Sequence, residues 1–155
     1  SDYKALASDV FKICRQYDVL CILHSFVSAA IALKADAIHL PLPSLMQLSR
    51  ADKARFSVIG ASCHSAEEAV AAQAKGCTYV TAGHVFATRC KAGLPGRGLG
   101  FLKTVCRSVS VPVYAIGGIS ADNIDAVMQC GAKGACVMSG VMACEDVQRY
   151  LGELK

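Results

Sequence analysis

The 155-residue sequence contains no tryptophan, and aromatic residues make up only 6% of it. Its hydrophobic share is nevertheless 54%, so small aliphatic side chains must form most of the core. No apolar run reaches the ~18 residues that a membrane span needs, and the first residues show no signal-peptide pattern. These absences argue against a membrane partner and favour one cytoplasmic α/β domain over residues 1–155, with strands covered on both faces.

Charge and cysteine spacing argue against two further classes of protein. The net charge is only +4, and no basic stripe alternates with aromatic residues, which disfavours nucleic acid as a partner. The nine cysteines are odd in number and form no CxxC pair. Most fall inside apolar helix or strand patterns, which favours reduced thiols packed as small hydrophobic side chains. A metal site or a disulfide is the alternative, and we expect no cofactor.

Helical and strand patterns alternate along the chain every 20 to 30 residues or so, as in repeated βα units. The first helix, residues 3–17, places Leu6, Val10, Ile13 and Cys14 on one apolar face. The predicted strands are residues 19–23, 37–40, 57–61, 79–82, 113–116 and 134–138. The other predicted helices are residues 26–33, 44–53, 66–75 with Ser65 as cap, 99–108, 121–130 and 145–154.

The alternation predicts a (β/α)8 TIM barrel that is incomplete, with about six parallel strands. A closed barrel of this type has eight strands and roughly 250 residues. Because the chain opens with a helix, we expect the first two βα units to be missing. Two open strand edges would favour self-association, so a homo-oligomer is expected.

Two glycine-containing turns are the strongest candidates for a phosphate site. Gly117 and Gly118 follow one predicted strand, and Ser139 and Gly140 follow the last one. Glycine lets backbone N–H groups approach an anion, and the positive end of a following helix adds attraction. In barrels, the loops after the seventh and eighth strands often bind phosphate. The alternative is that each pair only makes a tight turn.

The long loop of residues 83–98 is rich in glycine and basic residues. Long loops within compact domains are usually functional. His84 stands just beyond a strand's carboxyl end, where barrel enzymes place catalytic groups, and histidine can both take and give a proton near neutral pH. Arg89, Lys91 and Arg97 could attract an anionic substrate. The alternative is a solvated basic loop with a structural histidine.

The remaining histidines differ in their expected roles. His24 ends a predicted strand at the same rim as His84 and is a candidate for lining the pocket, whereas His39 reads as a core residue with its hydrogen bonds satisfied. His64 precedes a helix and reads as part of its cap. No carboxylate stands at the carboxyl end of any predicted strand, which argues against a magnesium-dependent diphosphate reaction.

Five motifs resemble the thiamine phosphate synthase/TenI family of (β/α)8 barrels. They are residues 35–40 (ADAIHL), 60–69 (GASCHSAEEA), 83–88 (GHVFAT), 112–119 (PVYAIGGI) and 138–141 (MSGV). The resemblance runs from the first helix to the last and covers the family's units after the second strand. It therefore implies the same barrel fold as the βα pattern.

The family has two branches, which differ at the site. In the synthase branch, which joins a pyrimidine diphosphate to a thiazole phosphate, two aspartates hold magnesium. This chain has Ser25 and Ser44 at those places, and it has residues 83–86 (GHVF) where the synthase has GPVF. These departures weaken the match to the synthase branch.

The TenI branch, the thiazole tautomerases, shares the histidine at position 84 and the basic stretch 90–98 (CKAGLPGRG). This resemblance implies that the chain aromatises a carboxythiazole phosphate by moving a proton from a ring carbon to an exocyclic carbon. His84 would be the general acid and base, the backbone of Gly117, Gly118, Ser139 and Gly140 would bind the phosphate, and no metal would be needed. His24, Thr88, Lys91 and Arg97 would contact the small phosphorylated thiazole, with Lys91 or Arg97 neutralising its carboxylate.

The match to the TenI branch also has a departure, since residues 24–26 (HSF) replace the asparagine and arginine usual there. Two alternatives stay open. One is a divergent thiamine phosphate synthase. The other is a non-catalytic regulatory protein that binds thiazole phosphate or thiamin phosphate.

Overall fold

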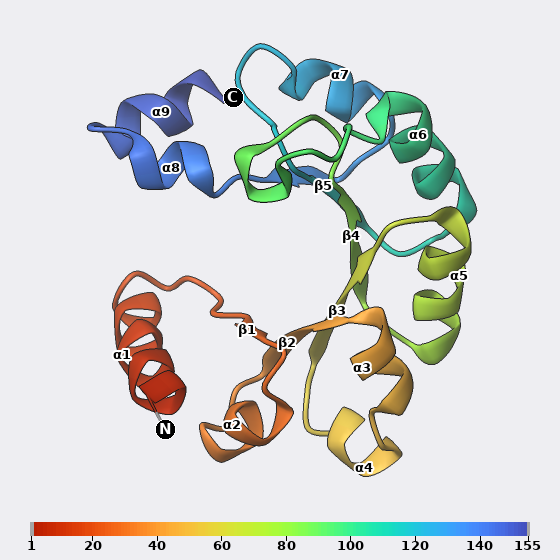
Figure 1. Cartoon of the computed structure of the whole chain (residues 1–155). Helices are drawn as coiled ribbons and strands as arrows, with labels where there is room; N and C mark the ends of the chain where they lie inside the picture. Colours follow the sequence, from red (N-terminus) through yellow and green to blue (C-terminus); the bar gives the residue numbers. More distant parts are fainter. Residues whose placement is uncertain (1, 155) are drawn as a thin grey trace.

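The computed structural model describes residues 2–154, whose strands form one curled, parallel sheet of six. The strands follow chain order across the sheet, from β1 at one edge to β6 at the other. Their bounds are β1 Leu23–His24, β2 Ala37–Pro41, β3 Val58–Cys63, β4 Tyr79–Gly83, β5 Val113–Ile116 and β6 Gly134–Cys136. Figure 1 shows helices along the convex side of this sheet, so the predicted incomplete TIM-type barrel is confirmed as a half-barrel.

The helices agree with the predicted alternation, with two differences in detail. Their bounds are α1 Asp2–Gln16, α2 Val27–Ala32, α3 Leu42–Gln47, α4 Arg50–Lys53, α5 Ala66–Lys75, α6 Gly98–Ser108, α7 Ile124–Gln129, α8 Ser139–Ala143 and α9 Val147–Glu153. A 3-10 turn, η1, spans Arg89–Lys91. The single helix predicted over residues 44–53 is wrong, because Leu48 is extended and Ser49 starts α4 by accepting a hydrogen bond from the Asp52 amide. The short helix α8 was not predicted.

The hydrophobic core lies between the convex face of the sheet and the helices that cover it. Alternate strand residues point to this side, and Leu40 of β2 and Val80 of β4 are fully buried there. Leu45 of α3 and Leu102 and Val105 of α6 are also fully buried in the same cluster. The small aliphatic core expected from the composition is therefore present.

The concave face of the sheet lines an open cavity, contrary to the prediction that the strands are covered on both faces. His39 of β2, Ser62 of β3 and Thr81 of β4 point into the half-barrel. These residues alternate with the buried aliphatic residues along each strand. The strand segments look largely apolar in the sequence because most of their residues are the buried aliphatic ones that face the helices.

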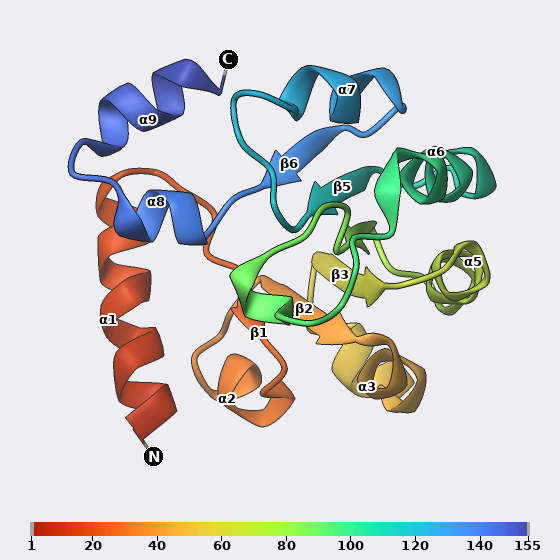
Figure 2. The same cartoon turned by 45° about the horizontal axis from the view of Figure 1, so that its top comes forward.

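Two predictions about the first 23 residues are wrong. The predicted apolar face of α1 is exposed at Leu6, Val10 and Ile13, and Ala7 is the residue of this helix that is buried. The predicted strand 19–23 is reduced to β1, and residues 19, 20 and 22 are exposed. The reason is visible in Figure 2, where α1 lies at the open side of the half-barrel and β1 is an edge strand. No helix within residues 2–154 is long and apolar enough to cross a membrane.

Candidate active site

A cavity of about 1470 Å³ opens on the concave face of the sheet. The loops that follow β3, β4, β5 and β6 line its rim, as expected for a site at the carboxyl ends of parallel strands. Eight of the nine predicted site residues line it: His24, His84, Thr88, Lys91, Gly117, Gly118, Ser139 and Gly140. The fold thus gathers residues from four separate loops and one edge strand into one cavity.

His84 is held in place by the loop that carries it. Its backbone carbonyl accepts a hydrogen bond from the Arg97 amide at 3.0 Å, because residues 95–98 fold back over the start of the loop. The ring nitrogen Nε2 lies 3.1 Å from the Pro95 carbonyl oxygen. A carbonyl can only accept, so Nε2 carries the proton and Nδ1 keeps a lone pair. His84 is therefore equipped to act as a base.

The Gly117–Gly118 turn packs directly against the His84 loop. The amides of Val85 and Phe86 donate to the carbonyls of Ile116 and Gly117 at 2.9 and 3.0 Å. Gly117 has a φ of 101°, and a Cβ there would overlap the Cα and Cβ of His84. Glycine is therefore required at this position both by conformation and by space.

The helices that follow the two glycine turns begin at other residues than predicted. Ser139 begins α8, but α7 does not begin until Ile124, several residues after Gly118. Asn123 shapes the intervening segment: its side chain accepts from the Ser120 amide and donates to the Gly118 carbonyl, both at 3.0 Å. Sequence reasoning missed Asn123, although asparagine is a common turn-forming residue.

The basic residues of the 83–98 loop separate into two groups. Lys91 lines the cavity beside Thr88 and Cys90. Arg97 does not line it, since its guanidinium stacks 5.6 Å from the centre of the Phe101 ring. The structure therefore does not bring Arg97 to the cavity with the other predicted residues, because the Phe101 ring one helical turn later attracts its cation.

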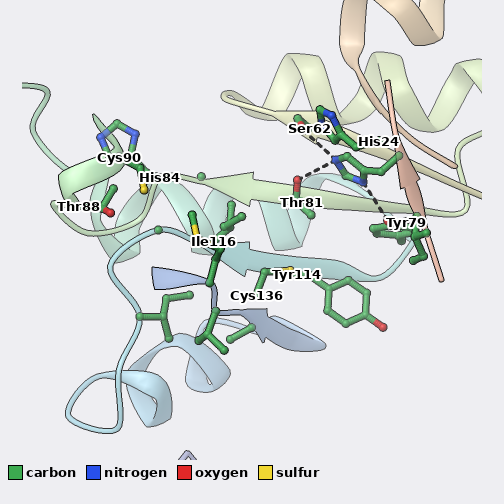
Figure 3. A pocket seen from close by; sticks show the side chains of 18 of the residues that line it. His24, Ser62, Tyr79, Thr81, His84, Thr88, Cys90, Tyr114, Ile116 and Cys136 are labelled. Atoms are coloured by element: carbon green, nitrogen blue, oxygen red, sulfur yellow. Dashed lines mark hydrogen bonds between the residues drawn. The ribbon is translucent and has the colours of Figure 1, made fainter. Parts of the chain in front are cut away.

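His39 is the centre of a hydrogen-bonded group deeper in the cavity. Its Nδ1 lies 2.9 Å from the Tyr79 hydroxyl, and its Nε2 lies 2.8 Å from the Ser62 hydroxyl and 3.4 Å from that of Thr81. Burial, and secondarily the neighbouring His24, lowers the pKa of His39 to about 4. Burial likewise raises the pKa of Tyr79 to about 12. The predicted hydrogen bonds of His39 are confirmed, but its ring lines the cavity and does not lie in the hydrophobic core. Figure 3 labels its partners Ser62, Thr81 and Tyr79, which lie apart from His84 and Thr88.

His64 and His24 complete the set of histidines. The predicted cap role of His64 is wrong for its side chain, because Ser65 is the cap and the His64 ring Nδ1 lies 2.8 Å from the Gly83 carbonyl. The ring of His64 lines the cavity, which sequence reasoning missed. His24 stacks on His39 with ring centres 5.7 Å apart.

The cysteines follow the predicted pattern, except that Cys90 and Cys136 line the cavity. Cys63 and Cys77 are buried, and burial raises the pKa of the Cys63 thiol to about 12. Cys90 is exposed at the cavity. None of the nine cysteines is in a disulfide.

The residues present do not fit a magnesium ion, which the synthase branch of the family implies. No aspartate or glutamate lines the cavity within residues 2–154. Nor does that part of the chain bring together three or more histidine, cysteine, aspartate or glutamate side chains as a metal site would need. Magnesium takes carboxylate oxygen ligands by preference, so the donor set is unsuited to it.

Comparison with known proteins agrees with this architecture. The family model described as "Thiamine monophosphate synthase" matches residues 1–141. The chain belongs to this family. A "Thiamine-phosphate synthase" of Pyrococcus furiosus is 40% identical over 145 residues, covering 93% of this chain and 70% of that protein. One from Pyrococcus abyssi is 34% identical over 151 residues, covering 97% and 72%.

A solved structure supports the same conclusion. The thiamine phosphate pyrophosphorylase of Pyrococcus furiosus superposes with a TM-score of 0.82 at 33% identity, covering 99% of this chain and 74% of that one. The resemblance to the thiamine phosphate synthase/TenI family is thereby confirmed. The names of these relatives favour the alternative prediction, a synthase, over a tautomerase.

Proposed function

We propose that this chain is an enzyme of thiamin biosynthesis that binds a phosphorylated thiazole. The observation that carries the proposal is the cavity shared by His84, the Gly117–Gly118 turn and Ser139–Gly140. The phosphate would lie against the backbone amides of the two turns, and the ring would extend toward His84. Lys91 lines the same cavity and would neutralise a carboxylate on the ring.

The reaction that these residues support best is the tautomerase reaction. The lone pair of His84 Nδ1 takes a proton from the ring carbon, the electrons shift through the ring, and a proton is delivered to the exocyclic carbon. Atoms and charge balance, since the product is an aromatic isomer of the substrate. The step needs a positioned base, an anion cradle and no metal ligand, which matches the lining of the cavity.

A second candidate is the synthase reaction, because the relatives at 40% and 34% identity carry that name. It joins a pyrimidine diphosphate to a thiazole phosphate. The same two turns would bind the thiazole phosphate. We derive no step for this reaction through magnesium, because carboxylate ligands are missing from the cavity.

One pair of assays on the purified protein separates the candidates. We expect turnover of the dearomatised carboxythiazole phosphate, and a loss of at least about 100-fold in His84→Ala. Inorganic phosphate binding, measured by calorimetry, should persist in that variant and serves as its control for folding. Magnesium-dependent formation of thiamin phosphate would instead establish the synthase. Tight binding of thiazole phosphate with neither activity would indicate a regulatory protein.

A further inference from the structure

The four histidines at the cavity differ in which ring nitrogens are free. His39 has both nitrogens within hydrogen-bond distance of side-chain hydroxyls, so it has none to offer a ligand. His24 lies at the edge strand β1, with Nδ1 2.7 Å from its neighbour Ser25. His24, His84 and His64 each use one nitrogen, but only for His84 and His64 is the partner a backbone carbonyl, which fixes the nitrogen that carries the proton. Each therefore keeps one nitrogen for chemistry.

The tautomer of His64 follows from its partner. Nδ1 lies 2.8 Å from the Gly83 carbonyl oxygen, and a carbonyl only accepts, so Nδ1 carries the proton. Nε2 is then the nitrogen that is left to gain or lose a proton, and the ring is exposed at the cavity. A backbone carbonyl that holds one imidazole nitrogen and frees the other is a usual arrangement for a histidine that transfers protons.

The same hydrogen bond places His64 next to His84. Gly83 immediately precedes His84, so the His64 ring touches the peptide group that leads into the catalytic loop. On the far side of His84, Gly117 packs against its Cα and Cβ. The loops after β3, β4 and β5 thus meet at the Gly83–His84 peptide, and His64, His84 and Gly117 all line the same cavity.

We propose that His64 is a second catalytic residue, which exchanges a proton with the substrate in concert with His84. This rests on the proposed tautomerase function. His84 takes the proton from the ring carbon at Nδ1, and His64 gives a different proton from Nε2 to the exocyclic carbon while its Nδ1–H stays on the Gly83 carbonyl. After one turnover His84 is protonated and His64 is neutral, and both exchange with water to reset. Two separate acid–base residues suit this reaction, because the ring carbon that loses a proton and the exocyclic carbon that gains one lie at different places on the ligand.

Two variants distinguish a catalytic role from a structural one. In His64→Asn the side-chain amide can still donate to the Gly83 carbonyl, but it has no counterpart of Nε2. His64→Ala loses both. We expect both variants to lose on the order of 100-fold in turnover while inorganic phosphate binding stays within about twofold of the parent. Near-parental turnover in His64→Asn would overturn the proposal and leave His64 as a positioning residue.

An isotope experiment tests the inference without any substitution. Substrate carrying deuterium at the ring carbon is turned over in ordinary water, and the exocyclic carbon of the product is examined by NMR. If His84 removes the deuterium and His64 supplies a different proton, the exocyclic carbon of the product should carry no deuterium. Deuterium transferred to that carbon would mean that one imidazole carries the proton throughout, which contradicts the proposal. If the parent protein turns over no thiazole phosphate at all, the proposed function fails instead.

Discussion

At the scale of single residues, the hydrogen-bond partner of each imidazole decides what that histidine can do. His39 faces three hydroxyl groups and is satisfied, whereas His84 and His64 each face one carbonyl and keep a free nitrogen. Among the four histidines, the sequence indicates His84 as the catalytic candidate because it directly follows a predicted strand. The prediction for His64 was wrong because its position just before a helix also suits a cap. Only the contact of its ring with the Gly83 carbonyl, in the neighbouring loop, shows that it points into the cavity.

The lowered pKa of His39 makes the stability of the protein depend on pH. The folded state holds His39 neutral down to about pH 4, whereas the unfolded chain protonates near the ordinary value of 6.5. The unfolded state therefore binds more protons between these values, and stability falls as the pH drops through that window. We expect a loss of about 2 kcal/mol in unfolding free energy from about pH 7.5 to pH 5, measured by urea denaturation.

The matched control for this pH effect is His39→Gln. In that variant the unfolding free energy should no longer fall by the His39 contribution between pH 7.5 and pH 5, although its overall stability is expected to be lower. An unchanged slope in His39→Gln would show that other groups cause the pH dependence.

Gly117 offers a second prediction at this scale. Gly117→Ala places a Cβ against His84 and should lower turnover tenfold or more, on the order of what a misplaced catalytic group costs. Gly93→Ala is the control, since Gly93 also has a positive φ of 82° but no atom lies within 4 Å of its Cβ position. It should lose only about 1 kcal/mol of stability and keep its turnover. Equal loss of turnover in the two variants would refute the steric argument.

At the scale of elements, the sequence predicted helix starts and strand ends correctly where these depend on residues close together in the chain. Ser65 predicted the start of α5 correctly, and the strands β4 and β5 lie within one residue of their predicted ends. The signals failed at α3 and α4, where the apolar pattern continues across a break in the backbone. The path of the 83–98 loop was also not predictable, because backbone bonds to the next loop hold it.

The cap of α5 gives a prediction for this scale. The Ser65 hydroxyl accepts a hydrogen bond from the Glu68 amide at 3.2 Å, so Ser65→Ala should lower the unfolding free energy by about 1 kcal/mol. The control is Ser108→Ala at the last residue of α6, where the hydroxyl only donates to the Thr104 carbonyl. This change should alter the unfolding free energy by less than about 0.5 kcal/mol. Equal effects in thermal denaturation would argue against the cap.

At the scale of the whole molecule, one core joins the sheet to its covering helices. Leu102 of α6 is fully buried in it, and Leu102→Ala should cost roughly 2–5 kcal/mol in unfolding free energy. Leu94 is 56% exposed in the 83–98 loop, so Leu94→Ala should cost less than about 0.5 kcal/mol. A small effect of Leu102→Ala in urea denaturation would contradict the description of a single shared core.

The sequence by itself determined the βα alternation, the six parallel strands, the two glycine turns and the position of His84. Each depends on residues close together in the chain, where periodicity, caps and strand ends leave a direct signal. Only the tertiary structure decided that the concave face lines an open cavity, that Arg97 stacks on Phe101 and that His64 lines the cavity. Those outcomes depend on which distant segments the curled sheet brings into contact, and no local pattern records that.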